Sequence, residues 1–222
     1  MGFPLVATPL IALALDVKTA VAVTILPNVA MDAAQVVRGG DLLATARRLA
    51  SVLALSVPGT ILGTYLLVLL SAETASMTLG VVVLAFVAMS AAGRMPRIPA
   101  RWDAPLAALA GLAAGVLTGV TNAAGPPLVM YFQGVGMDKQ EFVRSISLVF
   151  VTVKAAQLAA TGWYGLLTWP LLLASVGLTV VGLVAFAVGL RLQDRLPERT
   201  FQRLVLGFLA VVGAWLVVRG LG

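Results

Sequence analysis

The sequence predicts an all-α polytopic membrane protein in which about six to seven helices cross the bilayer completely. Of its 222 residues, 60% are hydrophobic and only 11% are charged, whereas soluble domains carry roughly 25% charged residues. Several apolar runs approach or exceed the ~20 residues that a helix needs to cross a bilayer. Short segments of alternating polarity, which the strands of a membrane β-barrel require, do not recur along the chain.

Eight apolar stretches, separated by charged or Gly/Pro-rich connections, are the expected membrane helices. They cover approximately residues 3–15, 18–37, 49–70, 75–92, 104–135, 142–161, 166–190 and 202–218. The first is short, and the fifth is too long for one helix and is expected to be broken. Two series of glycines four residues apart predict close packing of helix backbones rather than ligand binding. They are Gly59 and Gly63, and Gly111, Gly115 and Gly119.

Charge and residue types narrow the functional classes. The net charge is +6, but the basic residues lie in short loops between apolar runs, where they indicate membrane topology rather than nucleic-acid binding. The chain has no cysteine and no histidine, which excludes disulfides, thiol catalysis, histidine metal sites and Ser-His-Asp hydrolysis. We therefore expect no enzyme activity, no metal and no cofactor, and we expect the lipid bilayer as a partner.

The long fifth stretch contains the sequence "TGVTNAAGPPLVMYF" at residues 118–132. Irregular backbone at membrane depth is tolerated only where it is buried in protein or lines a watery cavity. Pro126 and Pro127 suit the first turn of a helix, so we expect a short helix from here to about Phe132. Its N-terminal amides and positive dipole end would favour an anion in the break. The alternative is a proline kink with only structural meaning.

An internal repeat divides the chain. Residues 2–23 resemble residues 125–146. Gly2 and Pro4 match Gly125 and Pro127 at an offset of 123, and Asp16, Gln35 and Gly40 match Asp138, Gln157 and Gly162 at an offset of 122. We expect a first membrane repeat at 1–103, which lacks its leading helix arm, and a second at 104–222. Each repeat would contribute a half-helix, and the two N-termini would face each other.

The distribution of basic residues predicts how the broken stretch sits in the bilayer. If residues 104–135 cross once, seven basic residues lie on each side of the membrane. If they form a re-entrant hairpin, twelve lie on one side, and only Lys18 and Arg219 lie on the other. The positive-inside rule favours the hairpin, which also makes the two repeats inverted. The loops at 38–48, 94–103, 137–144 and 191–203 are then expected to face the cytoplasm.

Polar residues inside the apolar stretches are further candidates. Asp32 and Lys154 occupy equivalent positions of the two repeats, and an unpaired charge at mid-membrane costs about 2.5–3.5 kcal/mol. A mutual ion pair would offset that cost. Asn28 and Gln35 share the helix face of Asp32, and Gln157 is the equivalent of Gln35. A static salt bridge, a lysine that reaches the interface and a role in ion coupling all fit this pattern.

Nine residues are candidates for contact with an anion. They are Gly2, Pro4, Asn28, Thr121, Asn122, Gly125, Pro126, Pro127 and Arg144. Asn122 offers a donor at the break, and Gly125 is expected to allow a close approach or a backbone dihedral that a Cβ would forbid. Arg144 lies early in its helix, where an ordinary cytoplasmic charge is the favoured interpretation over one that guides an anion inward.

Two segments resemble the motifs of a known family. "MGFPLVATPLIALALDVKTAVAVT" and "GVLTGVTNAAGPPLVMYFQGVGMDKQEFVRS" are similar to the two repeat motifs of the sulfite exporter TauE/SafE family, and with "PGTILGTYL" the resemblance spans nearly the whole chain. It implies two repeats of membrane helices and transport of sulfite, organosulfonates or related sulfur anions, commonly as export. By motif, the site carries over to Gly125, Pro126 and Pro127, and to Gly2 and Pro4.

Together these patterns predict a secondary transporter that exports a small sulfur-containing anion across a bacterial-type inner membrane. The chain contains no Gly-x-x-x-x-Gly-Lys-Ser/Thr loop, so nucleotide binding is not expected. The alternative is a non-transporting membrane scaffold or assembly subunit that uses its glycines to pack partner helices. The sequence leaves open whether the chain forms a homodimer.

Overall fold

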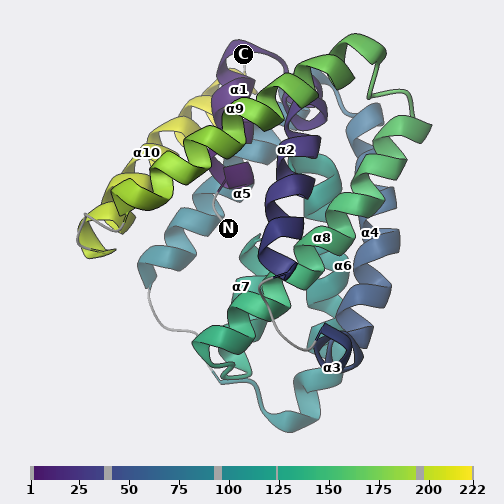
Figure 1. The fold of residues 1–222 in the computed structure, drawn as a ribbon, viewed down its shortest axis with the longest axis vertical. Helices are drawn as coiled ribbons and strands as arrows, with labels where there is room; N and C mark the ends of the chain where they lie inside the picture. The colour runs from purple at the N-terminus through teal and green to yellow at the C-terminus, as the bar shows by residue number, and fades with distance from the viewer. Residues whose placement is uncertain (1–2, 38–41, 93–96, 124, 194–197, 222) are drawn as a thin grey trace.

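The computed structural model describes residues 3–37, 42–92, 97–123, 125–193 and 198–221. Within these residues the regular secondary structure is entirely helical, which confirms the predicted all-α class (Figure 1). The helices are α1 (Phe3–Ala14), α2 (Val17–Val37), α3 (Leu42–Arg48), α4 (Ala50–Leu69), α5 (Ala72–Ala92), the 3-10 helix η1 (Ala100–Trp102), α6 (Asp103–Thr121), α7 (Gly125–Gly134), α8 (Lys139–Trp163), α9 (Trp169–Gln193) and α10 (Glu198–Arg219).

Five helices of the described chain are long and apolar enough to cross a membrane. Their spans are Val17–Ala34, Ala50–Leu69, Ala72–Ala91, Ala100–Thr121 and Gln140–Trp163. Within α9 and α10, the apolar parts with described side chains cover Trp169–Ala185 and Leu204–Arg219. The protein is therefore a multi-pass membrane protein, as predicted. The short helices α3 and η1 were not expected from the sequence, because their seven and three residues give too little periodicity to detect.

The connections gather at two ends of the molecule. At one end, Arg48 of α3 forms an ion pair with Glu141 of α8. At the other, Lys18 donates a hydrogen bond to the Val68 carbonyl over 2.9 Å, and Arg219 donates to the Ala12 carbonyl over 2.7 Å. The segments around residues 48 and 141 therefore lie together, away from the α1–α2 and α4–α5 turns, as Figure 1 shows.

The two glycine series hold α4 against α6. A Cβ on Gly63 would lie 2.2 Å from the Val116 carbonyl oxygen, and one on Gly115 would lie 2.2 Å from that of Ser56. These distances are far shorter than a van der Waals contact, so only glycine lets the two backbones approach this closely. The prediction that these residues serve helix packing is confirmed.

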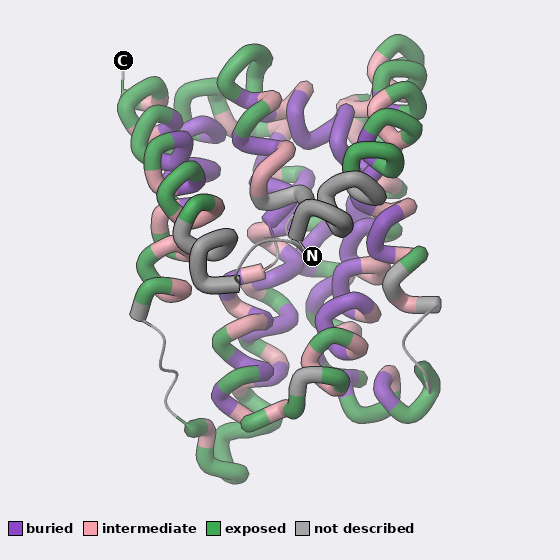
Figure 2. Tube along the Cα trace, turned by 60° about the vertical axis from the view of Figure 1, so that its left-hand side comes forward, coloured by how far each residue is buried: buried purple, intermediate pink, exposed green. Residues whose placement is uncertain are grey.

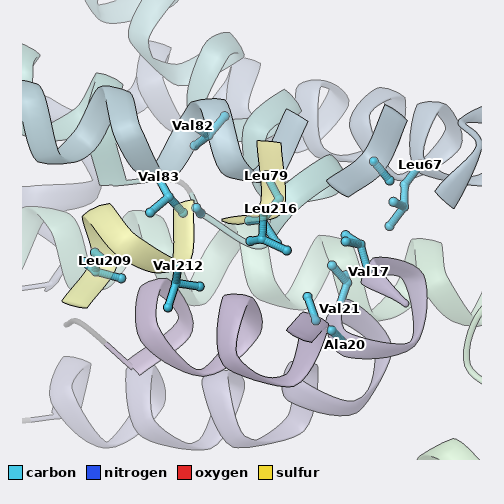
Figure 3. Packing of buried hydrophobic residues seen from close by; sticks show 13 residues of the cluster. Val17, Ala20, Val21, Leu67, Leu79, Val82, Val83, Leu209, Val212 and Leu216 are labelled. Atoms are coloured by element: carbon cyan, nitrogen blue, oxygen red, sulfur yellow. The ribbon is translucent and has the colours of Figure 1, made fainter. Parts of the chain in front are cut away.

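Apolar side chains fill the interior and also cover the outside. Figure 3 shows one buried cluster in which Val17 and Val21 of α2 lie near Leu79 of α5 and Leu216 of α10. In Figure 2 the buried residues concentrate in the centre and the exposed ones on the outer helix faces. Many of the exposed residues are large and apolar, such as Val180, at 62%, and Val211, at 71%. This arrangement suits a lipid environment.

The segment from Asp103 to Gly134 is a helical hairpin. The Tyr131 hydroxyl in α7 donates to Oδ1 of Asp103, at the start of α6, over 2.7 Å. The backbone N–H of Ile98 donates to the carbonyl of Gly134, at the end of α7, over 2.8 Å. The chain therefore returns to the end of the molecule at which α6 begins.

Candidate functional site

The turn of the hairpin is built around Asn122, which ends α6. Its φ is 66°, a left-handed conformation that Asn tolerates better than most residues. The side chain is completely buried, and its Nδ2 donates to Oγ1 of Thr24 over 2.7 Å and to Oγ1 of Thr8 over 3.2 Å. The break in the hairpin is thus tied to both α1 and α2.

Lys154 places a positive charge directly at this break. Its side chain comes from α8 and is only 1% exposed. The ammonium donates to the Asn122 carbonyl over 3.0 Å, to Oδ1 of Asn122 and to Oε1 of Gln157 over 3.1 Å. Gln157 in turn donates from Nε2 to the Thr118 carbonyl over 2.7 Å. All three ammonium protons therefore have acceptors.

Lys154 finds its hydrogen-bond acceptors at the break rather than on Asp32. Among the described residues no salt bridge joins the two side chains, although their charges are near enough to interact. The physical reason is the end of α6, whose last carbonyls lack helical partners and carry the negative end of the helix dipole. Lys154 satisfies these acceptors directly through Asn122, and Gln157 satisfies another.

Asp32 and Asn28 of α2 form a second polar region beside the break. Both are buried, at 4% and 1% exposure. Three of their side-chain atoms have no hydrogen-bond partner: Nδ2 and Oδ1 of Asn28, and Oδ2 of Asp32. Asn28 lies one turn after Thr24, which contacts Asn122. The partnerless atoms are therefore adjacent to the turn of the hairpin.

The N-terminus of α7 differs from the expectation for Gly125. Its φ is not left-handed, and Asn122 takes that conformation instead, so a special dihedral is not the reason for a glycine here. A Cβ built at Gly125 meets no atom within 4 Å outside its chain neighbours and its own helix backbone, so the close approach of an anion stays a prediction. Pro126 and Pro127 lack N–H groups, so the first turn of α7 presents the amides of Gly125 and Leu128 together with the helix dipole.

The other predicted site residues are not all brought to the break. Thr121 donates its hydroxyl to the Leu117 carbonyl of its own helix over 2.7 Å. Arg144 is ten residues before Lys154 on α8, about 15 Å along the axis, and lies near the Arg48–Glu141 pair. Pro4 lies in the first turn of α1. Gly2 and the side chains of Pro4 and Gln35 lie outside the described residues.

Three threonines of the site were missed by sequence reasoning. Thr8, Thr24 and Thr118 are completely buried. The signal for Thr24 was available, because it lies four residues before Asn28 on the same helix face. Thr8 and Thr118 have no comparable pattern, since threonine is common in membrane helices and only the tertiary fold brings these two to Asn122 and Gln157.

A cavity of about 350 Å³ lies on the other side of the hairpin. Its lining is almost entirely apolar and comprises Ile98, Leu106, Leu109, Ala110, Ala113, Pro127, Met130 and Tyr131. Leu109 and Met130 are exposed at the molecular surface. With no charged side chain in its lining, this cavity does not suit an anion.

The family follows from a comparison with known proteins. The family model described as "Sulfite exporter TauE/SafE" matches residues 1–216. The chain belongs to the sulfite exporter TauE/SafE family. Searches of curated proteins and of solved structures found no match. Membership in TauE/SafE confirms the resemblance and makes the chain a membrane transport protein of the sulfite-exporter type, in agreement with the expectation that it is not an enzyme.

Proposed function

We propose that this TauE/SafE protein is a secondary transporter that exports a small sulfur anion, such as sulfite or an organosulfonate, bound at the break between α6 and α7. The observation that carries the proposal is the ammonium of Lys154, fully buried and hydrogen-bonded to Asn122 at that break. The positive charge of this ammonium would attract a small anion to the break.

The backbone around the break supplies the second contribution. The N-terminus of α7 carries the positive end of a helix dipole, and the space beside Gly125 is free of protein atoms. In Figure 1, α1 and α7 extend from the middle of the molecule toward opposite ends. We assign the anion to the two half-helix N-termini, with Gly125, Pro126 and Pro127 on one side and Gly2 and Pro4 on the other. Lys154 supplies a positive charge at a fixed position, because its ammonium already donates hydrogen bonds to Asn122 and Gln157.

The same proposal includes the arrangement in the bilayer. Residues 1–103 and 104–222 form two inverted repeats, and the α6–α7 hairpin is re-entrant, so that it enters and leaves on the cytoplasmic side of an inner membrane. The hydrogen bond between Ile98 and Gly134 and the twelve-to-two distribution of basic residues support this. A cysteine introduced at Gln140 should react with an impermeant maleimide only from the cytoplasmic side. Reaction from outside would contradict the re-entrant hairpin.

Transport is tested with purified protein in liposomes loaded with sulfite. We expect sulfite efflux well above that of protein-free liposomes, and efflux from Lys154→Gln liposomes at least about tenfold slower, because the fixed charge is lost. Arg144→Gln is the matched control, since this cation lies about 15 Å from the break and should leave most of the flux. Wild-type liposomes that release sulfite no faster than empty ones would favour the scaffold alternative.

A further inference from the structure

The partnerless atoms of α2 indicate a site of their own. Buried polar atoms in native proteins nearly always have hydrogen-bond partners, and each exception requires an explanation. Nδ2 and Oδ1 of Asn28 and Oδ2 of Asp32 are three such exceptions, on side chains that lie one helical turn apart. Three partnerless atoms on one face of one helix are best explained by a ligand that contacts both side chains.

The chemistry of these atoms selects the kind of ligand. Two of the three are oxygens, and one belongs to a carboxylate, which is the ligand type that hard cations prefer. The i, i+4 spacing brings both side chains within reach of one small ion. Pro27 directly precedes Asn28 inside α2, and because proline has no N–H, the carbonyl of Val23 lacks its helical donor.

The charges around Asn28 and Asp32 also favour a cation as the ligand. Asp32 and Lys154 together are neutral, and their charges interact. A transported anion would add a negative charge inside the membrane, where an unbalanced charge is costly. One monovalent cation bound at the same time restores neutrality.

We propose that Asn28 and Asp32 form a binding site for a small monovalent cation, Na⁺ or a proton, that is taken up together with the transported anion. Oδ1 of Asn28 and Oδ2 of Asp32 receive the cation, and Nδ2 of Asn28 remains as a donor toward the anion. The cation site rests on the partnerless atoms alone. Its coupling to the anion rests on the proposed function.

The charged residues on the helices that pack against α2 do not replace Asp32 as the acceptor of the cation. The helices packed against α2 are α1, α5, α8 and α9. Neither α1 nor the part of α9 with described side chains carries a charge. Helix α5 has Glu73 in its first turn. The charged residues of α8 besides Lys154 all lie in its first two turns: Lys139, Glu141 and Arg144.

The cation site is tested on purified protein without sulfite. The melting temperature is measured with NaCl and with N-methylglucamine chloride at equal ionic strength, and again in Na⁺-free buffer as the pH is lowered from 8 to 5. If Na⁺ is the ion, NaCl raises the melting temperature of the wild type by roughly 3–8 °C. If the proton is the ion, acidification alone stabilises the wild type. Either response should disappear in Asp32→Asn.

Two further variants make this result specific. Asn28→Ala should raise the cation concentration needed for half of the response at least about tenfold. If Asp32→Asn does not fold, Asn28→Ala replaces it in the test. Asp16→Asn is the matched control, because it makes the same chemical change on an exposed carboxylate directly before the same helix and should respond like the wild type. A wild type that responds to neither Na⁺ nor acid, or an Asp32→Asn variant that responds equally, would overturn the cation site.

The coupling is tested by titrating sulfite with and without the ion that produced the response. We expect sulfite to bind at least about fivefold more tightly in its presence, since coupling between two sites is reciprocal. An unchanged sulfite affinity would overturn the coupling while the proposed transport function stands. No sulfite binding in either buffer would overturn the proposed function and the coupling together, but not the cation site.

Discussion

The short helices α1 and α7 are followed by α2 and α8, and the buried polar residues of these two helices differ in how many hydrogen-bond partners they have. On α8, the side chains of Lys154 and Gln157 form one hydrogen bond with each other and three with Asn122 and Thr118, and none of their polar atoms is left without a partner. On α2, Asn28 and Asp32 occupy a comparable place beside the break and contain the three buried partnerless atoms of the described chain. Asp32 and Lys154 occupy equivalent positions in the sequence. In the structure, the ammonium of Lys154 has hydrogen-bond acceptors, whereas Oδ2 of Asp32 has no partner.

This difference separates residues needed for folding from residues that matter mainly for binding. Lys154 and Gln157 complete the end of α6 and fix the turn of the hairpin, so they should be required for folding whether or not they also serve the anion. Asn28 and Asp32 leave three buried atoms without a hydrogen-bond partner, so these two residues should matter mainly when a ligand is bound. Stability measurements on matched variants can therefore confirm or contradict the comparison.

The largest effect is expected for Lys154→Met. This change leaves Asn122 and Gln157 without their donor and Asp32 without its countercharge, and removing one member of a buried charged network typically costs about 3–5 kcal/mol. We expect this loss in the free energy of unfolding, measured in mixed micelles. Adding Asp32→Asn to Lys154→Met should recover part of it. Strictly additive losses would show that the two charges do not interact.

Asn122 should give the next largest effect. Asn122→Ala removes the hydrogen bonds to Thr8, Thr24 and Lys154 and places a Cβ residue at a φ of 66°, which together should cost about 2–4 kcal/mol. Asn122→Gly removes the same bonds but accepts the left-handed backbone, so it should be less destabilised by about 1 kcal/mol. Equal losses in thermal unfolding would mean that the backbone conformation contributes little.

The two helix caps should behave alike, in contrast to the core residues. The Thr19 amide donates to Oδ1 of Asp16 over 3.0 Å, and the Glu141 amide donates to Oδ1 of Asp138 over 2.9 Å. Asp16→Ala and Asp138→Ala should each cost about 1 kcal/mol at pH 7. A clear difference between them would mean that α2 and α8 differ at their caps as well.

The Asp16 cap should also depend on pH. Burial raises the pKa of this carboxyl, but hydrogen bonds from the hydroxyl and amide of Thr19 outweigh it and hold the pKa below the ordinary value of 3.8. A lowered folded-state pKa stabilises the fold above the unfolded value of about 4, and this stabilisation is lost as the pH falls through the folded-state pKa. The difference between Asp16→Ala and wild type should therefore shrink below pH 4.

The smallest effect is expected for Asp32→Asn, measured in Na⁺-free buffer at pH 8. The carboxylate is buried without a partner at Oδ2, so its replacement by a neutral side chain of the same shape removes a desolvation cost while it also removes the attraction to Lys154. We expect a net change within about 1 kcal/mol. A loss as large as that of Lys154→Met would contradict the proposed division of roles.

The sequence predicted most of the fold because the membrane restricts the choices. Apolar runs separated by charged loops defined the long helices, and glycines at intervals of four indicated the α4–α6 contact that the structure contains. The pair Asn122 and Gly125 correctly marked the turn between α6 and α7. These are local signals, so a single sequence is sufficient to detect them.

The partners of Lys154 could not be predicted in the same way. The offset between the repeats suggested Asp32, but which acceptor a lysine reaches depends on where the end of α6 lies in three dimensions. A special backbone dihedral was likewise one of two alternatives for Gly125, because glycine is the usual choice, whereas Asn122 adopts the left-handed conformation. In both cases tertiary contacts decided between alternatives that local sequence leaves equal.

The central claim is that a sulfur anion binds beside Gly125, at the N-terminus of α7. A Cβ at this position meets no atom within 4 Å outside its chain neighbours and its own helix backbone, so Gly125→Val should fold but occupy the space assigned to the anion. Gly177→Val, on the exposed face of α9, also meets no protein atom and is the matched control. The most direct measurement is sulfite binding to the purified variants by isothermal titration calorimetry. The account predicts wild-type affinity in Gly177→Val and a loss of at least about a hundredfold in Gly125→Val, whereas wild-type affinity in Gly125→Val would show that the anion binds elsewhere.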